Sequence, residues 1–298
     1  MPELPEVEVV RRGLDTHVRG RRFASVDCLH PRAIRGLEGG EDQLKALLVG
    51  QEVISLQRRG KFLWLVLGTG DSASQSEVLG DGECLLVHLG MSGQMLIKDA
   101  AADADDPNFR HLRIRARLDD GQQLWFVDQR TFGYWLPCEL VQTATGVVPR
   151  TVTHIARDLL DPQLCLSTLA RGIKAQRGEI KKVLLNQEIV AGIGNIYADE
   201  MLFAATLHPR QPAHRISEKR LVELLRHGQD VMLRALEQGG TSFDELYVNV
   251  NGQSGYFDLS LHAYGQHGRG CDRCGEILVR EKFGNRSSHF CPACQRLY

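Results

Sequence analysis

The stretch HLRIRARL (His111–Leu118) indicates most directly how this chain folds. Apolar residues alternate along it with His or Arg, and a period of two is typical of a β-strand buried on one face. The basic face is compatible with an anionic partner and equally with simple solvation. Further short apolar runs predict strands at residues 62–67, 84–89, 94–97 and 124–127. The N-terminal half is therefore predicted to be mainly β, arranged as a sandwich.

Helix patterns replace strand patterns in the second half of the chain. The Thr/Gly/Pro-rich run at residues 142–153 predicts a linker. Beyond it, apolar residues recur at helical spacing between an N-cap at Ser217 and a stop at Gly239. A helix is also predicted from Glu6 to Leu14, directly after two prolines. We expect an α+β fold with a β-sandwich domain (1–135), a linker (136–153), a helical domain (154–261) and a small metal module (262–298).

Four cysteines near the C-terminus form two CxxC pairs separated by sixteen residues. Two chelating pairs of soft thiolates are the ligand set of tetrahedral zinc, and a site closed by four thiolates has no open position for catalysis. Without a metal, this short segment has few large apolar groups to fold around. We therefore predict one structural Zn²⁺ bound by Cys271, Cys274, Cys291 and Cys294.

Composition indicates an ordinary soluble protein. No apolar stretch approaches the roughly 18 to 20 residues that span a bilayer, and the start MPELPEVE lacks the basic region of a signal peptide. We expect a cytoplasmic location without a membrane partner. The scattered cysteines are expected to be reduced core thiols; they are Cys28, Cys84, Cys138 and Cys165.

A net charge of −1 does not exclude a nucleic-acid partner. Eight acidic residues fall in two stretches without Lys or Arg, at 71–83 and 99–106, and the rest of the chain carries +7. DNA binding needs one basic face and not a basic total. The purpose of the acidic stretches, which look like loop insertions, does not follow from the sequence.

The extreme N-terminus places two prolines and three carboxylates in eight residues. Methionine before a small residue is normally removed, and Pro2 would then carry a free secondary amine with a pKa near the usual α-amino value of about 8. Such an amine is a nucleophile that forms an iminium with a sugar aldehyde, and the adjacent Glu3 is a candidate acid for the sugar oxygen. The same residues are also compatible with a plain capped helix start.

Together these residues resemble the formamidopyrimidine-DNA glycosylase family, also called MutM, from residue 2 to residue 296. The matching motifs are PELPEVE (2–8), RRGK (58–61), HLGMSG (88–93), D-x-R-x-FG (128–133), GIGNIYADE (192–200), SGYF (254–257) and Arg286 before the final CxxC. The resemblance implies a helix-two-turn-helix element in the helical domain and a β-hairpin zinc finger after it.

The resemblance also implies catalytic roles. Pro2 would be the Schiff-base nucleophile, Glu3 the acid that opens the sugar ring, and Glu6 a supporting group. Lys61 would act as general acid/base and phosphate contact, a role that rests wholly on the resemblance because a lone lysine is more often surface charge. Arg286 would reach a phosphate near the lesion.

An enzyme that acts on a base must extrude it from the stack, and the void must be filled. In the family this is done by side chains that match Met91 as a plug, Arg130 facing the orphaned base, and Phe132 as a wedge. Core packing is the alternative for Met91 and Phe132. His88 and His111 match DNA-contacting histidines, although either is compatible with an ordinary strand position.

The Gly192–Asn195 segment precedes a predicted helix, with Asn195 as its N-cap. Glycines before a helix leave backbone N–H groups free for a phosphate, so Asn195 is a predicted DNA contact. Asp199 and Glu200 near the helix start would equally suit the helix dipole.

Two positions depart from the family pattern. The familiar DPRRFG reads DQRTFG at 128–133, which loses a proline and an arginine and puts DNA affinity in doubt. A basic DNA contact of relatives falls at Gln176, with Arg177 beside it, and we leave that contact unassigned.

The sequence therefore predicts a bifunctional glycosylase/lyase that removes 8-oxoguanine or formamidopyrimidines and then cleaves the strand by β- and δ-elimination. Its partner would be damaged double-stranded DNA. The enzyme would act as a monomer and be associated with the nucleoid. One rival is an endonuclease VIII-like enzyme for oxidised pyrimidines, but those start PEGPE where this chain has Leu4. Another is a non-catalytic zinc-finger DNA-binding homologue, against which Pro2, Glu3 and Lys61 argue together.

Overall fold

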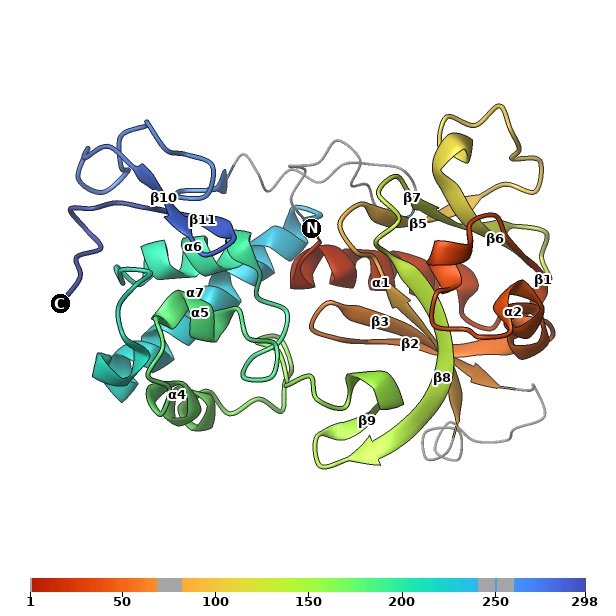
Figure 1. Ribbon diagram of the computed structural model, residues 1–298, viewed down its shortest axis with the longest axis horizontal. Coiled ribbons are helices and arrows are strands. Elements are labelled where there is room, and N and C mark those ends of the chain that lie inside the picture. The colour runs from red at the N-terminus through yellow and green to blue at the C-terminus, as the bar shows by residue number, and fades with distance from the viewer. Residues whose placement is uncertain (1, 69–81, 241–249, 251–259) are drawn as a thin grey trace. The chain divides into compact units, whose positions relative to one another are not determined.

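A computed structural model describes residues 2–68, 82–240, 250 and 260–298 (Figure 1). The chain divides into two compact units. Unit 1 holds Met1–Pro2, Glu6–His154 and Thr241–Gly255, and unit 2 holds Glu3–Pro5, Ile155–Gly240 and Tyr256–Tyr298. Among the described residues, none of the helices combines the length and the apolar character needed to span a membrane.

Unit 1 contains two antiparallel sheets. One has the order β2-β3-β4-β8-β9 and the other β1-β6-β7-β5. Their strands are β1 (Phe23–Cys28), β2 (Glu52–Arg59), β3 (Phe62–Gly68), β4 (Glu83–His88), β5 (Gly93–Lys98), β6 (Leu112–Leu118), β7 (Gln123–Asp128), β8 (Tyr134–Thr143) and β9 (Gly146–Pro149). Helix α1 (Leu4–Val18), the short α2 (Gly40–Leu48) and both sheets contribute side chains to one apolar core. The β-rich N-terminal domain with an N-terminal helix is thus confirmed.

Strand β6 shows the predicted alternation. Its apolar residues are buried, whereas the arginines between them are half-buried or exposed. Arg113 donates to the Asp128 carbonyl at 2.7 Å, and Arg115 pairs with Asp27 at 3.0 Å on β1. Two arginines of this basic face are therefore engaged within the unit.

The segment predicted as a linker, residues 136–153, is not a linker in the structure. Most of it forms β8 and β9, which pair as a hairpin from Thr143↔Gly146 to Leu140↔Pro149. Gly146 has φ +113°, a backbone conformation that glycine adopts readily. Thr and Gly therefore mark a hairpin turn here, and the chain passes to unit 2 only after His154.

Unit 2 is helical and ends in a β-hairpin, as predicted. Its helices are α4 (Leu166–Lys174), α5 (Ile180–Leu184), α6 (Asn195–Ala204) and α7 (Glu218–Glu237), and the hairpin strands are β10 (Val279–Phe283) and β11 (Arg286–Phe290). The Ser217 side chain accepts from the Arg220 amide, so the predicted cap of α7 is confirmed. Helix α6 is buried almost all round, and the other helices of the unit pack with it around a second core.

Candidate functional site

The carboxylate of Glu3 caps the N-terminus of α6. Its Oε2 accepts from the amides of Gly194 at 2.7 Å and Tyr197 at 3.3 Å, and its Oε1 accepts from Ile196 at 3.0 Å. Glu3 is 3% exposed. Both oxygens are thus oriented by backbone donors at a helix N-terminus, where a carboxylate also interacts favourably with the helix dipole.

This arrangement corrects two predictions. The N-cap of α6 is Gly194 and not Asn195, and the amides expected to be free for a phosphate bind Glu3. The physical reason is space, because a Cβ at Gly194 would lie 2.2 Å from the Glu3 carboxyl carbon. At Gly192, with φ +87°, a Cβ would meet Leu4 at 2.6 Å. The glycines make room for the N-terminal residues of the chain.

A buried ion pair connects the hairpin of β10 and β11, called the finger hairpin below, to helix α6. Lys181 Nζ lies 2.6 Å from Asp199 Oδ1 and 2.9 Å from the Ser287 carbonyl, and both side chains of the pair are at most 1% exposed. The carboxylate of Asp199 also accepts from Ser288 Oγ and the His289 amide. Burial lowers the pKa of Lys181, while the charge of Asp199 opposes this shift. This pair could not be predicted from the sequence, because a single lysine and a single aspartate eighteen residues apart form no motif.

Asn195 and Glu200 have structural partners as well. Asn195 Nδ2 donates to the Ser287 carbonyl at 3.0 Å, which adds a second tether between α6 and β11. Glu200 accepts from the backbone amides of residues 262–264, and burial raises its pKa. Glu200 therefore holds the backbone of residues 262–264 and Asp199 holds β11, whereas the sequence offered the helix dipole as an alternative role for both.

Arg286 begins β11 at the tip of the hairpin and is exposed. The turn before it contains Gly284, with φ +59°. The Arg286 side chain is thus exposed to solvent, while the backbone of β11 is hydrogen-bonded to Asp199 and Lys181. This position is suitable for an anion contact.

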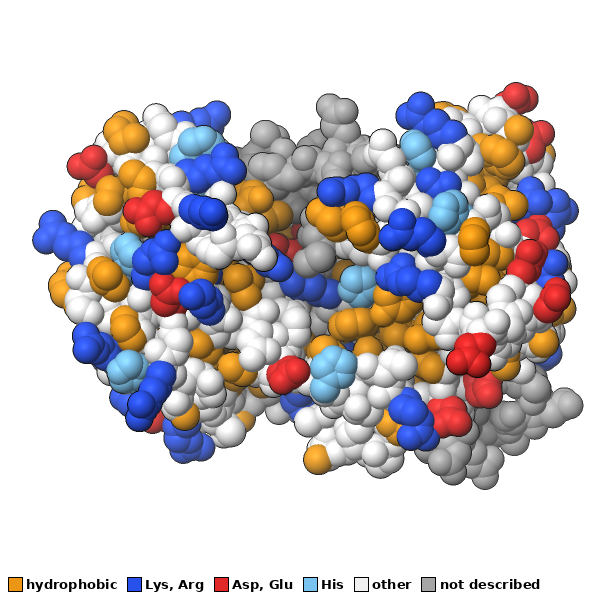
Figure 2. Space-filling model, in the orientation of Figure 1, with side chains coloured by type: hydrophobic (Ala, Val, Ile, Leu, Met, Phe, Trp, Pro, Cys, Tyr) orange, Lys and Arg blue, Asp and Glu red, His pale blue; other side chains and the backbone are white. Residues whose placement is uncertain are grey.

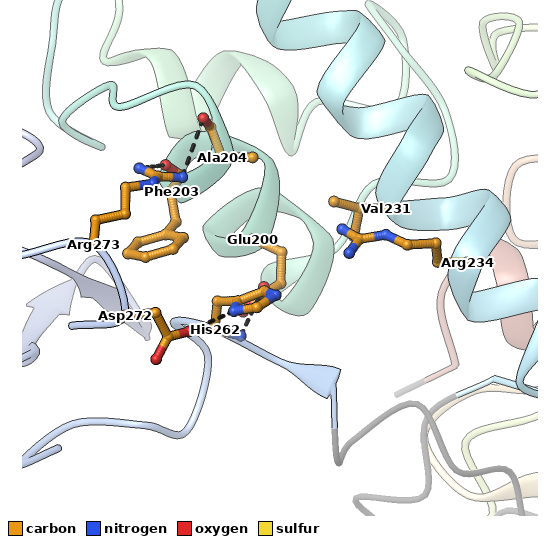
Figure 3. Close-up of a pocket in the computed structure, with 8 residues that line it drawn as sticks. All are labelled: Glu200, Phe203, Ala204, Val231, Arg234, His262, Asp272 and Arg273. Atoms are coloured by element: carbon orange, nitrogen blue, oxygen red, sulfur yellow. Dashed lines mark hydrogen bonds and ion pairs between the residues drawn. The ribbon is translucent and has the colours of Figure 1, made fainter. Parts of the chain in front are cut away.

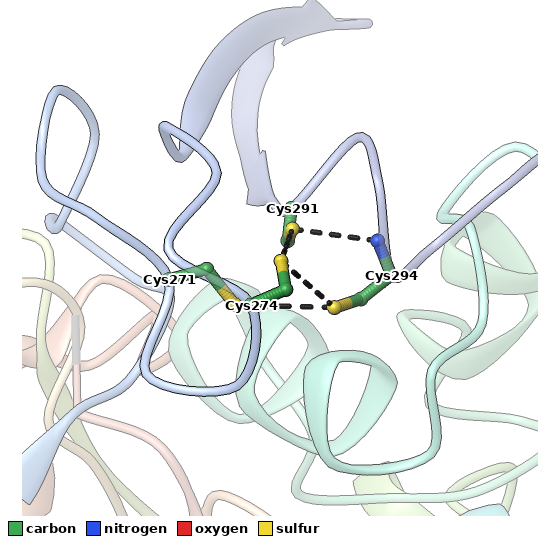
Figure 4. Close-up of side chains that lie close together, drawn as sticks. All are labelled: Cys271, Cys274, Cys291 and Cys294. Atoms are coloured by element: carbon green, nitrogen blue, oxygen red, sulfur yellow. Dashed lines mark hydrogen bonds between the residues drawn. The ribbon is translucent and has the colours of Figure 1, made fainter.

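The four predicted zinc ligands lie together (Figure 4). The sulfur atoms of Cys271, Cys274, Cys291 and Cys294 are all within 4.8 Å of one another, and none is in a disulfide. This donor set fits one tetrahedral zinc ion. Cys271 and Cys291 pack with Phe203 and Leu278 in a small apolar cluster, so a metal would bind inside a formed core.

In unit 1, Lys61 occupies the tight turn between β2 and β3 and is 9% exposed. The turn is fixed by Arg58, which donates to the Gly60 carbonyl at 2.9 Å and to Glu8 on α1 at 3.0 Å. Burial alone would raise the pKa of Glu8, but Arg11 and Arg58 outweigh it and lower this pKa to about 2. The helix that follows Pro2 in sequence is thereby joined to the turn that carries Lys61. Pro2 and Glu6 are both buried.

His88 is a neutral imidazole at physiological pH. Burial and the charges of Lys61 and Arg35 lower its pKa to about 4. Its Nδ1 accepts from the Gly90 amide at 3.0 Å, so the proton is assigned to Nε2. The ring stacks on Tyr134 with 5.5 Å between centroids. His88 can therefore offer one neutral N–H donor, at Nε2.

The loop after β7 is organised by the carboxylate of Asp128, which is fully buried. Asp128 Oδ1 accepts from Ser92 Oγ at 2.6 Å and from the Arg130 amide at 3.1 Å, and its Oδ2 accepts from the Gly133 amide at 2.7 Å. Thr131 has φ +55°, an uncommon conformation for a β-branched residue. The backbone of residues 128–133 is thus tightly held.

The three side chains predicted to fill the void in the base stack lie on this loop and on the adjacent turn. Phe132 is 45% exposed, Arg130 is exposed with its guanidinium over the Phe132 ring, and Met91 is half-buried in the β4–β5 turn. The turn packs against the loop, because a Cβ at Gly90 would meet the Gly133 nitrogen at 2.4 Å. The core-packing alternative is wrong for Phe132.

Arg35 is a residue that the sequence analysis missed. Its guanidinium donates to the carbonyls of Phe132 at 2.9 Å and Gly133 at 3.2 Å, and it lies over the Tyr134 ring. It therefore holds the loop from outside while Asp128 holds it from within. No motif surrounds Arg35 that could have indicated this.

The remaining candidates are less informative. His111 is half-buried, with its pKa lowered by burial and by Arg110. Gln176 is exposed and donates to the Gly172 carbonyl. In the second acidic stretch, Asp106 pairs with Lys98 at 2.7 Å. Most of the first stretch and the SGYF motif lie outside the described residues.

One pocket of unit 2 is lined by Glu200 and Phe203 together with side chains of α7 and of residues 262–273 (Figure 3). It lies at the C-terminal end of α6, where Arg273 donates to the carbonyls of Phe203 and Ala204. His262 Nδ1 lies 2.6 Å from Asp272, and Glu200 holds backbone amides. These charged groups are thus already used in packing the finger segment.

Models of three protein families match the chain. They are the formamidopyrimidine-DNA glycosylase N-terminal domain (residues 1–135), the formamidopyrimidine-DNA glycosylase H2TH domain (155–245) and a zinc finger found in FPG and IleRS (271–297). The H2TH match covers α4 to α7, and the zinc-finger match covers the four cysteines.

Close relatives and solved structures agree with these matches. The chain is 61% identical to formamidopyrimidine-DNA glycosylase of Corynebacterium diphtheriae and 59% to that of Corynebacterium efficiens, with 100% of each chain covered. It is similar to Lactococcus lactis Fpg in complex with DNA containing an abasic site, at a TM-score of 0.80, 29% identity and 99% coverage of both chains. A Lactococcus lactis mutant bound to Fapy-dG DNA gives a TM-score of 0.81 at 28% identity, with 99% of this chain and 100% of that chain covered. This chain therefore belongs to the formamidopyrimidine-DNA glycosylase family.

Proposed function

We propose that Pro2, Glu3 and Lys61 carry a glycosylase/lyase reaction on oxidised purines in double-stranded DNA. The observation that supports this best is the capping of α6 by Glu3. Both oxygens of this carboxylate are held by three backbone amides, and the residue before it is the N-terminal proline, so a fixed carboxylate is adjacent in sequence to the proposed nucleophile. Membership of the family supplies the activity class, DNA glycosylase with AP lyase activity.

In the first step, the deprotonated nitrogen of Pro2 attacks the anomeric carbon of the lesion's sugar. The bond from that carbon to the damaged base breaks, the base leaves with the electron pair and takes a proton from water, and a bond to the proline nitrogen forms. Glu3 accepts the proton that this nitrogen now loses and passes it to the ring oxygen, whose bond to the anomeric carbon breaks, so that the opened sugar is held as an iminium on Pro2. The fixed orientation of Glu3 is suited to aiming one oxygen at that ring atom.

In the second step, the iminium acts as an electron sink. A proton leaves the carbon next to it, the 3′ phosphate departs by β-elimination, and the 5′ phosphate follows by δ-elimination. Lys61 is the proposed proton carrier and phosphate contact in these steps. Its turn is held to α1 through Arg58 and Glu8, so the ammonium group is positioned without depending on a flexible loop.

We also propose that the loop of Asp128–Gly133 and the Met91 turn fill the void left by the extruded base. Two features support this: the backbone is held at Asp128 and Arg35, and Phe132 and Arg130 are exposed. An apolar wedge beside a cation suits a gap in a base stack. Arg286 and the Nε2 of His88 are proposed phosphate contacts.

The charge distribution is compatible with this partner. Figure 2 shows Lys, Arg and His side chains grouped on the visible face of unit 1, whereas acidic side chains of this unit gather mostly towards the right of the view. Phosphate contacts of this kind make affinity fall steeply with salt. We propose that the enzyme acts on DNA as a monomer, in the cytoplasm near the nucleoid.

Oxidised purines are the proposed substrates because the N-terminal motif has Leu4 after Glu3, as the purine enzymes do. The enzymes for oxidised pyrimidines have glycine at this position. Oxidised pyrimidines are a second candidate, since one solved Lactococcus lactis relative is a complex with oxidised-pyrimidine DNA. Its TM-score is 0.80 at 28% identity, with 99% of this chain and 100% of that chain covered.

A panel of duplexes tests this proposal. Wild-type protein and Pro2→Gly are compared on 8-oxoguanine, formamidopyrimidine and oxidised-pyrimidine strands under single-turnover conditions. We expect fastest cleavage of the purine lesions by wild type and a much slower reaction by Pro2→Gly. Equal cleavage by the two proteins would overturn the role of Pro2, and faster cleavage of pyrimidine lesions would overturn the purine preference.

A further inference from the structure

Two cysteines that the proposed reaction does not use face each other in the larger sheet of unit 1. Cys84 on β4 and Cys138 on β8 are direct partners in the antiparallel register. Their sulfur atoms are 3.7 Å apart, and neither is in a disulfide. Cys165, by contrast, is exposed and has no cysteine partner among the described residues, which corrects its prediction as a core thiol.

The environment makes the two thiols unequal. Cys84 is fully buried, whereas Cys138 is half-buried. The hydrogen bond with Cys138 and burial raise the pKa of Cys84. The hydrogen bond from Cys84, and another from Thr151, lower the pKa of Cys138. Cys138 is therefore the better nucleophile, and Cys84 is a protonated neighbour within reach of it.

The geometry of the strand pair suits a covalent link. Direct partners in an antiparallel pair have Cα atoms about 4.5 to 5.5 Å apart. Disulfides span Cα separations of about 4.4 to 6.8 Å, a range that overlaps the one for direct strand partners. The sulfurs need to approach by less than about 2 Å to reach bonding distance, which side-chain rotation can supply. We propose that Cys84 and Cys138 are a peroxide-sensitive thiol pair that closes a reversible disulfide between β4 and β8.

The chemistry needs only hydrogen peroxide as oxidant. The Cys138 thiolate attacks one peroxide oxygen, the O–O bond breaks, and hydroxide leaves, which converts the thiolate to a sulfenic acid. The Cys84 thiol then attacks the sulfenic sulfur, an S–S bond forms, and water leaves with the thiol proton. Each disulfide thus consumes one peroxide, and a dithiol reverses it. Transient disulfides of this kind are the ones expected in a reducing cytoplasm.

The link would join β4, which carries the proposed contact His88, to β8, which follows the loop of Asp128–Gly133. β4 ends at His88, β8 begins at Tyr134, and these two residues are also register partners. Residues 84 and 138 enclose a long stretch of chain, so the disulfide restricts the unfolded state strongly. We expect the oxidised protein to melt about 5 °C or more above the reduced one, with lesion cleavage retained.

Peptide mapping of the zinc-loaded, full-length protein tests the proposal. Trypsin releases residues 62–98 and 131–150, and each peptide contains a single cysteine, Cys84 or Cys138. After brief treatment with hydrogen peroxide and blocking of free thiols, we expect the two peptides joined, and separate again after dithiothreitol. The experiment uses a Cys165→Ser background, because hydrogen bonds from Ser167 and Thr168 lower the pKa of exposed Cys165 to about 6. Recovery of both peptides with blocked thiols, or of Cys138 oxidised alone, would overturn the proposal.

Single variants test the order of events. In Cys84→Ser we expect Cys138 to stop at the sulfenic acid, which dimedone traps, and the rise in melting temperature to disappear. In Cys138→Ser we expect Cys84 to resist peroxide. Equal dimedone labelling of the remaining cysteine in both variants would contradict the assignment of Cys138 as the attacking thiol.

Discussion

The loop of Asp128–Gly133 in unit 1 and the N-terminus of α6 in unit 2 hold their candidate residues in opposite ways. In the loop, Asp128 and Arg35 hold the backbone, while the side chains of Arg130 and Phe132 are exposed. At the helix, the side chain of Glu3 is itself held by three amides and is buried. A group that enters a base stack must be free to move, whereas a group that transfers a proton must have its oxygens aimed. The predictions below test this contrast.

The largest effect is expected for Glu3→Gln. The amide cannot donate the carboxyl proton and presents an NH₂ group to backbone donors, so cleavage of an 8-oxoguanine duplex should slow by about 10² to 10⁴. Single-turnover strand cutting measures this rate. Affinity for an uncleavable abasic-analogue duplex and the thermal melting curve are the controls for binding and folding. A rate close to wild type would show that Glu3 is only a helix cap.

The next largest effect concerns the buried pair behind the finger hairpin. Asp199→Asn leaves the Lys181 ammonium buried beside a neutral partner, which should cost about 3 to 5 kcal/mol in the free energy of unfolding. Lys182→Met is the matched control, because Lys182 pairs with Glu179 but its side chain is 62% exposed. That change should cost less than about 1 kcal/mol. Urea denaturation compares the two, and equal losses would refute the structural role given to Lys181 and Asp199.

A pair of loop variants sharpens the contrast within unit 1. Asp128→Ala removes the acceptor of two loop amides and a hydroxyl, and should cost about 2 to 3 kcal/mol in stability as well as activity. Phe132→Ala removes an exposed ring, so stability should change by less than about 0.5 kcal/mol while lesion cleavage still falls. Thermal unfolding and cleavage rates are measured on both proteins. A large stability loss in Phe132→Ala would mean that the ring belongs to the core after all.

The smallest effect is a pH dependence carried by Glu8. Its pKa is lowered from 4.5 to about 2 in the folded chain. The unfolded chain therefore takes up this proton first on acidification, so the stabilisation is complete above about pH 4.5 and is lost as pH falls towards 2. We expect the ionised Glu8 to contribute about 1 to 2 kcal/mol to the free energy of unfolding. This is less than its full pKa shift implies, because its partner Arg12 is largely exposed to solvent. Urea midpoints of wild type and Glu8→Gln should differ at pH 6 and converge near pH 2; a constant difference would contradict the assignment.

Much of the fold could be predicted because local patterns reflect burial. The alternation in β6, the Ser217 cap of α7 and the CxxC spacing all depend on neighbours in sequence. The hairpin of β8 and β9 was taken for a linker, because its Thr/Gly turn has the same composition as one. Only strand pairing across the sheet distinguishes the two.

The candidate site divides in the same manner. Its exposed side chains Arg130 and Phe132 lie within a recognisable motif, D-x-R-x-FG, and could therefore be singled out from the sequence. The groups that hold them were missed or misplaced, since Arg35, the Lys181–Asp199 pair and the Glu3 cap join residues far apart in sequence. Contacts of this kind follow from the tertiary structure alone.

The central claim is that Pro2 is the nucleophile of this enzyme. Borohydride trapping on a duplex with 8-oxoguanine opposite cytosine, followed by mass spectrometry of the trapped N-terminal peptide, tests it most directly. We predict a covalent adduct on the nitrogen of Pro2, formed by wild type and lost when the N-terminal methionine is retained. An adduct on a lysine, or no adduct from a zinc-loaded protein with a free N-terminus, would contradict the account.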